Sequence, residues 1–238
     1  MTPVASSSQT TLKIGPPSLA RFDNFTPDGN EYAVGFLKQF AARQNEQVNC
    51  YLQGSFGSGK SHLLHAVCKM HENSIYIGLN DLQKQPEILE YAQNFELVCL
   101  DDVHSIAAQS DWESALMALF ENIKSNRNRL LVSADVPAQE LGLKLRDIAN
   151  RFSAAQVLKV CPIPHNCKAA ALIAQAASRG LTIEDSVIRF IVTRYPQDMH
   201  SLMRLLRRLE RLSLEKHRNI TIPFLKQFDF KDADAFIG

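Results

Sequence analysis

One eight-residue stretch constrains the fold and chemistry of this chain more than any other. It has the spacing G-x-x-x-x-G-K-[ST], the pattern of a loop that surrounds nucleotide phosphates, and it consists of Gly54, Ser55, Phe56, Gly57, Ser58, Gly59, Lys60 and Ser61. Glycine has no Cβ, so successive backbone N–H groups can turn inward around an anion. Lys60 can neutralise the β- and γ-phosphates, and the Ser61 hydroxyl can bind Mg²⁺.

The residues on each side of this loop are those that such a site requires. Residues 48–53 are rich in β-forming side chains and predict a strand, and residues 62–67, from His62 onward, predict a helix. In that order the N-terminus of the helix faces the phosphates. A Gly/Ser-rich surface turn is the alternative, but it requires neither the strand nor the helix. The sequence therefore predicts a nucleotide-binding loop.

Apolar strands and amphipathic helices alternate through the first two thirds of the chain. The predicted strands are nearly continuous apolar runs, as strands covered on both faces are, and they span residues 48–53, 74–79, 96–101, 129–134 and 156–161. An amphipathic helix over residues 30–43 precedes the first of them. The alternation predicts an α/β fold, with a five-stranded parallel sheet and helices on both faces.

The pattern changes after Pro162 and Pro164, where no further strand is predicted. The remaining helical periods span residues 166–178, 184–194 and 199–217, and residues 182–185 resemble a capping box. We therefore expect an α/β base over residues 21–162 and a small all-helical lid over 163–238. Residues 1–20 are rich in Ser, Thr and Pro, which predicts a flexible arm.

Charge and cysteine usage argue against several other classes of protein. The net charge of the 238 residues is +1, which gives no support for sequence-specific DNA binding. The cysteines number five, which is odd, and form no CxxC pair, so we expect neither a zinc site nor a disulfide framework. Free cysteines suit a reducing compartment, so we expect a cytoplasmic location. No apolar run approaches 18 residues, so no membrane span is predicted.

Two acidic residues, Asp101 and Asp102, follow the third predicted strand. The carboxyl end of a central parallel strand lies beside the phosphate loop. Asp101 could hold the Mg²⁺ shell there, and Asp102 could orient an attacking water. A strand end that simply meets solvent is the alternative, but the intact phosphate loop about 40 residues earlier favours the functional interpretation.

Polar residues also close the fourth predicted strand. Ser133 or Asp135 could contact the γ-phosphate or the attacking water. Asp135 could equally cap a helix that begins near Pro137. The sequence leaves both interpretations open.

Two arginines, Arg146 and Arg151, flank the helix predicted over residues 145–152. Surface ion pairs are the commoner fate of a single arginine. Either residue could instead reach the nucleotide of a neighbouring subunit as an arginine finger, in a homo-oligomer or with another partner. The sequence alone does not separate these roles.

Taken together, these features resemble the AAA+ module of the bacterial replication initiator DnaA. The residues that carry the resemblance are 22–25, 54–67, Asp101-Asp102, 133–135 and Arg151-Phe152. It covers about residues 20–228 and implies an AAA+ fold that binds ADP or ATP with Mg²⁺, with Phe25 beside the nucleotide. The nucleotide-sensing arginine of the family aligns with His200, and Arg204, one turn on, could substitute for it.

Within that family the chain looks like the Hda-type regulators, because no DNA-binding helix-turn-helix domain follows the module and no partner-binding domain precedes it. Residues 221–226 are also similar to the terminus of those regulators. The resemblance implies that the chain docks on the DNA polymerase sliding clamp and supplies Arg151 to DnaA-bound ATP, which negatively regulates replication initiation. The clamp motif would comprise Gln9, Leu12 and Ile14, with Thr10 in place of an expected leucine.

Two other functions fit the same features. An autonomous AAA+ ATPase, such as a helicase loader, would hydrolyse ATP without DnaA and would depend on Asp102. A non-catalytic adaptor would bind nucleotide only for stability, and Arg151 would be dispensable. The histidine at position 200 leaves open whether the chain hydrolyses ATP itself.

Overall fold

Five parallel strands form the sheet on which the base of the molecule is built. The computed structural model describes residues 19–82, 85–195 and 198–227. The strand order is β2-β3-β4-β1-β5, with β1 (Asn49–Gln53), β2 (Ser74–Gly78), β3 (Leu97–Asp101), β4 (Arg129–Ala134) and β5 (Gln156–Lys159). Every neighbouring pair is parallel, so the predicted five-stranded parallel sheet is confirmed.

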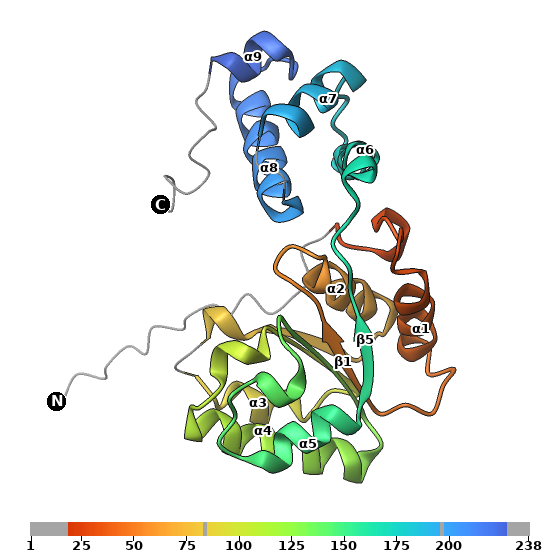
Figure 1. Cartoon of the computed structure of the whole chain (residues 1–238), viewed down its shortest axis with the longest axis vertical. Helices are drawn as coiled ribbons and strands as arrows, with labels where there is room; N and C mark the ends of the chain where they lie inside the picture. The colour runs from red at the N-terminus through yellow and green to blue at the C-terminus, as the bar shows by residue number, and fades with distance from the viewer. Residues whose placement is uncertain (1–18, 83–84, 196–197, 228–238) are drawn as a thin grey trace, which may run out of the picture.

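Helices cover both faces of this sheet (Figure 1). On one face, α1 (Glu31–Ala41) and α2 (Lys60–Met70) pack on Cys50, Leu52, Cys99 and Leu131. On the other, α3 (Ile88–Ala92), α4 (Ser110–Asn126) and α5 (Arg146–Ala154) pack on Tyr51, Val98, Leu100, Leu130 and Val132. Successive side chains of a strand point to opposite faces, so each apolar strand contributes to both cores.

Four helices with a separate apolar core form the lid: α6 (Lys168–Ser178), α7 (Asp185–Arg194), α8 (Met199–Lys216) and α9 (Ile222–Lys226). Leu202, Leu205, Leu206 and Leu209 of α8 are buried, at the spacing of a helix with one apolar face. The capping box expected at residues 182–185 is wrong. The N-cap of α7 is Glu184, without a side-chain cap bond, and Thr182 lies two residues before it.

The segment between β5 and the lid is held by polar contacts with the start of the base. Asn30 accepts a hydrogen bond from the N–H of Cys161 (2.7 Å) and donates one to its carbonyl (3.0 Å). Gln175 of α6 donates to the carbonyl of Asn24 (2.9 Å), in the short helix η1 (Phe22–Asn24). These contacts hold α6 next to η1 at the start of the base.

No helix within the described part of the chain is long and apolar enough to cross a membrane.

Candidate nucleotide-binding site

The phosphate loop runs from the end of β1 to the start of α2, as the sequence predicts. Gly59 is the N-cap of α2 and has a φ of 102°, and a Cβ there would lie 2.8 Å from the ring of Phe25. A Cβ on Gly54 would lie 2.4 Å from the carbonyl oxygen of Val160. Both glycines are therefore required by backbone conformation or by close approach.

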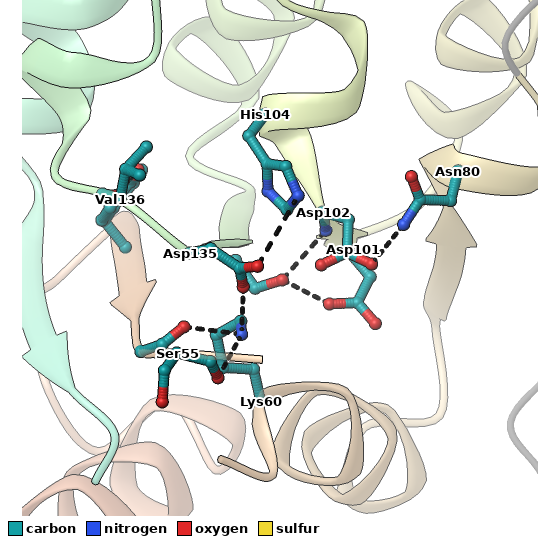
Figure 2. Close-up of polar contacts among 11 residues, drawn as sticks. Ser55, Lys60, Asn80, Asp101, Asp102, His104, Asp135 and Val136 are labelled. Carbon is teal, nitrogen blue, oxygen red and sulfur yellow. Dashed lines mark hydrogen bonds and ion pairs between the residues drawn. The ribbon is translucent and has the colours of Figure 1, made fainter. Parts of the chain in front are cut away.

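Lys60 is directed into the loop itself. Its Nζ donates to the carbonyls of Gly54 (2.7 Å) and Ser55 (3.2 Å) and pairs with Asp135 Oδ1 (2.7 Å), as Figure 2 shows. The side chain is only 5% exposed. These oxygens hold the ammonium group where it can exchange them for phosphate oxygens.

Asp135 therefore faces the phosphate loop rather than a helix terminus. The helix after β4 is η4 (Ala138–Glu140), whose N-cap is Pro137, so the capping role considered for Asp135 is wrong. The order β3-β4-β1 places the ends of these strands next to one another, which brings Asp135 to Lys60.

The two aspartates after β3 have different surroundings. Asp101 is buried, and its carboxylate accepts hydrogen bonds from the hydroxyls of Tyr76 (2.7 Å) and Ser133. Asp102 lines the cleft in a left-handed conformation (φ 60°), and its carboxylate accepts from Asn80 Nδ2 (2.6 Å). Burial and the neighbouring Asp101 raise the pKa of Asp102. Asp102 is thus the carboxylate of the two that lines the cleft, and the Mg²⁺ role of Asp101 stays a prediction.

His104 joins these acids, although the sequence analysis did not single it out. Its Nε2 lies 4.0 Å from Asp135 Oδ2, and the ligand atoms of Asp102, His104 and Asp135 all lie within 4.8 Å of one another (Figure 2). Together with the exposed hydroxyl of Ser61, the carboxylates offer hard oxygen donors of the kind Mg²⁺ prefers. The residues present therefore fit the expected cation. The signal in the sequence was the position of His104, two residues after Asp102.

A cleft of about 450 Å³ opens between the base and the lid. The base lines it with Asn24, Phe25, residues 56–62 and Asp102, and the lid lines it with Gln175, Arg179, Met199, His200, Met203 and Arg207. A volume of this size is within the range of small-molecule sites. A ligand in this cleft would touch both units.

Aromatic and imidazole rings line the two sides of this cleft. The ring of Phe25 lies 5.3 Å from that of His62, and the exposed ring of Phe56 lies 4.9 Å from that of His200. His62 Nε2 contacts the carbonyl of Arg21 (2.8 Å), and burial lowers the pKa of His62. The structure brings these four predicted nucleotide-binding residues together with the phosphate loop.

Helix α8 presents Arg207 to the cleft rather than Arg204. Each residue of a helix is rotated by about 100° from the one before it. Around the axis of α8, Met203 and Arg207 therefore lie on one side of His200, and Arg204 lies on the other side. Arg207 therefore lies on the lining face together with His200 and Met203. The periodicity of the sequence identifies this whole helix face but does not tell which edge of it meets the base.

Arg151 lies outside this cleft, on α5. It pairs with Glu121 Oε1 (2.5 Å) and Asp147 Oδ2 (2.9 Å), and its guanidinium lies over the ring of Phe120. These hydrogen bonds raise the pKa of Arg151. Its side chain is 27% exposed and both partner carboxylates are more exposed still, so the ion pairs lie on the surface. Arg146, at the start of the same helix, is exposed.

Comparison with known proteins agrees with this geometry. Residues 18–159 match the model of the bacterial DnaA ATPase domain, and residues 165–228 match that of the Hda lid domain. The chain belongs to the DnaA family of AAA+ proteins. The Hda match covers the four helices that we describe as the lid.

Solved structures show the same fold at low sequence identity. Domain III of DnaA from Thermotoga maritima has a TM-score of 0.75 at 19% identity, over 90% of this chain and 98% of that one. AMPPCP-bound DnaA from Aquifex aeolicus has a TM-score of 0.64 at 17% identity, over 83% and 65%. The Thermotoga maritima RuvB branch migration motor has a TM-score of 0.63 at 18% identity, over 87% and 70%. The AAA+ fold with a helical lid is confirmed.

The predicted clamp motif, Gln9, Leu12 and Ile14, lies outside the described residues. It stays a prediction.

Proposed function

We propose that this chain binds ADP or ATP with Mg²⁺ in the cleft between base and lid, docks on the DNA polymerase sliding clamp, and stimulates hydrolysis of DnaA-bound ATP. Gln9, Leu12 and Ile14 would contact the clamp, and Arg151 would act as the arginine finger. Such a regulator would negatively regulate replication initiation. The match of residues 165–228 to the Hda lid domain supports this choice among DnaA-family functions.

The position of Arg151 is the observation that carries the proposal. A finger acts on the nucleotide of another subunit, so it must lie away from its own cleft and be accessible. Arg151 meets both conditions, and the paired carboxylates of Glu121 and Asp147 hold its guanidinium in one orientation at the surface. Exposed ion pairs contribute little energy, so a phosphate could replace them at small cost.

Within the chain's own cleft, the residues present would bind and orient a nucleotide. Bound Mg²⁺ would offset the negative charge of the phosphates there. Lys60 would exchange Asp135 for a phosphate oxygen, and Asp102, oriented by Asn80, would face the terminal phosphate. His200 and Arg207 would contact the nucleotide from the lid and keep the two units together.

The proposal is tested by ATP turnover of DnaA in the presence of DNA-loaded clamp and this chain. Replacing the finger in Arg151→Ala should lower the stimulated rate by about 10³-fold or more, because fingers contribute that much in nucleotide hydrolases. Arg146→Ala, an exposed arginine on the same helix, is the matched control and should stimulate like the wild type. Equal stimulation by wild type and Arg151→Ala would instead favour a non-catalytic adaptor.

Clamp docking is tested separately by a pull-down with the sliding clamp. Deletion of residues 1–15 should abolish capture if Gln9, Leu12 and Ile14 form an extended peptide that enters a groove. Undiminished capture by the shortened chain would move the clamp contact to the base or the lid.

An autonomous ATPase is the second candidate, because Lys60, Asn80 and Asp102 are assembled in the cleft as hydrolysis would require. It predicts substantial ATP turnover by this chain without DnaA, abolished by Asp102→Asn. Turnover near background in the wild type would exclude it.

A further inference from the structure

A buried carboxylate on α4 takes no part in the cleft, yet it holds two segments of the base together. Glu113 is 0% exposed. Its Oε1 accepts from the backbone N–H groups of Ala108 (3.0 Å) and Lys144 (3.0 Å), and its Oε2 accepts from that of Leu145 (2.7 Å). A buried carboxylate is tolerated only with such donors, and bonds to an ionised acceptor are among the stronger ones.

The first of these segments begins at the cleft. From Asp102 to Gln109 the chain forms successive turns, each held by a backbone hydrogen bond. The N–H of Ser105 donates to the carbonyl of Asp102 (2.9 Å), that of Ala107 to His104 (3.4 Å) and that of Gln109 to Ile106 (3.3 Å). The residues at its two ends, Asp102 and Ala108, have φ values of 60° and 62°. Left-handed conformations of this kind are held only where surrounding contacts require them.

The second segment leads to α5. Lys144 and Leu145 immediately precede this helix, and Leu145 is its N-cap. Ile148 and Phe152 anchor the buried side of α5 in the core, which leaves Arg151 on the accessible side. The start of the helix that carries Arg151 is therefore fixed by the same carboxylate that fixes Ala108.

We propose that Glu113 is a positioning residue that couples the nucleotide cleft to α5. A nucleotide that contacts Asp102 would shift or stiffen the segment from Asp102 to Ala108. Glu113 transmits this change to Lys144 and Leu145 and so to the orientation of Arg151. The role of Arg151 at a partner's ATP rests on the proposed function, whereas the coupling within this chain does not.

The contact requires acceptor oxygens at the end of this side chain. A glutamine keeps one of them, and in the place of Oε1 it would still accept from Ala108 and Lys144, so Glu113→Gln could hold both segments. Glu113→Met keeps the length of the side chain but has no oxygen acceptor, so it cannot hold the two segments together. All three buried backbone donors would lose their acceptor in it.

Hydrogen exchange of the whole chain, with and without saturating ADP and Mg²⁺, tests the coupling. In the wild type we expect nucleotide to slow exchange of the Lys144 and Leu145 amides by about tenfold, because α5 becomes more firmly held. In Glu113→Met, with ADP raised to saturation for that variant, the rates with and without nucleotide should agree within about twofold.

Leu116→Ala is the matched control, because Leu116 is buried on the same helix and has no part in these hydrogen bonds. It should lower global stability and still show the nucleotide-dependent slowing. Three results would each overturn the proposal: equal exchange in the wild type with and without ADP, slowing that persists in Glu113→Met, or slowing lost in Leu116→Ala as well. None of them depends on DnaA, so the coupling and the finger are tested independently.

Discussion

Lys60 and Asp135 are 75 positions apart in the sequence, and their side chains form a 2.7 Å ion pair in the phosphate loop. The pair shows how single residues define this site. The loop carbonyls of Gly54 and Ser55 and the carboxylate of Asp135 satisfy the charge of Lys60. Ligand binding then exchanges one set of oxygens for another rather than exposing a buried charge.

Protonation of His65 should make stability depend on pH. Its ring is buried in contact with the ring of Tyr76, at 3.7 Å, and Nδ1 has no hydrogen-bond partner among the described residues. Burial lowers the pKa of His65 to about 4. The unfolded chain, with a pKa near 6.5, binds more protons below that pH, so the free energy of unfolding falls as the pH drops from about 6.5 toward about 4.

Urea unfolding at pH 7 and pH 4.5 measures this effect. His65→Phe keeps a ring against Tyr76 but cannot be protonated, so it should lose about 2.5 kcal/mol less stability than the wild type between the two pH values. His165→Phe replaces an exposed imidazole and should retain the pH dependence of the wild type. Parallel losses in the wild type and His65→Phe would contradict the assignment.

At the scale of the elements, helix α1 depends on a buried arginine from β4. The guanidinium of Arg129 donates to the carbonyls of Phe40 and Asn45 and lies over the Phe40 ring. It thus satisfies carbonyls at and beyond the C-terminus of α1, where a positive charge is favourable. One side chain of the sheet fixes the end of a helix that precedes it by more than 80 residues.

Loss of this guanidinium should destabilise the fold. Arg129→Met keeps most of the apolar stem and leaves buried carbonyls without donors, so we expect a loss of about 3 kcal/mol in the free energy of unfolding. Arg127→Met changes an exposed arginine two positions earlier and should cost less than about 0.5 kcal/mol. Chemical denaturation compares the two, and losses of similar size would mean that the carbonyls find other donors.

The base and the lid have separate apolar cores, and the cleft lies between them. A ligand that contacts both stabilises the pair without any change in either core. A nucleotide bound there would therefore stabilise the arrangement of the two units, an effect distinct from hydrolysis.

Bound nucleotide should raise the melting temperature of the chain. At 100 times the Kd, ADP with Mg²⁺ should stabilise the native state by about 2.7 kcal/mol, or about 5–10 °C for a chain of this size. Arg207→Ala should shrink this shift because Arg207 lines the cleft, whereas Arg204→Ala should leave most of it. Thermal unfolding at one fixed ADP concentration decides between them, and a larger effect of Arg204→Ala would show that the lid closes on its other edge.

The phosphate loop, the five strands and the helical lid could all be predicted from the amino-acid sequence. These features are encoded by neighbouring residues: glycines where the backbone must curl around an anion, continuous apolar runs for buried strands, and one apolar face per helix. The acidic end of β3 and the polar end of β4 were likewise predictable as parts of the site, because parallel strands present their carboxyl ends at one edge.

Which of those side chains line the cleft became clear only from the three-dimensional arrangement. Asp102 rather than Asp101 lines the cleft because Tyr76 and Ser133 occupy the carboxylate of Asp101. His104 joins the site because the short segment after β3 turns back toward Asp135. Arg207 rather than Arg204 lines the cleft because of the way the lid is placed on the base. Strand order, loop conformation and the docking of one unit on another depend on contacts between distant residues, which local patterns do not specify.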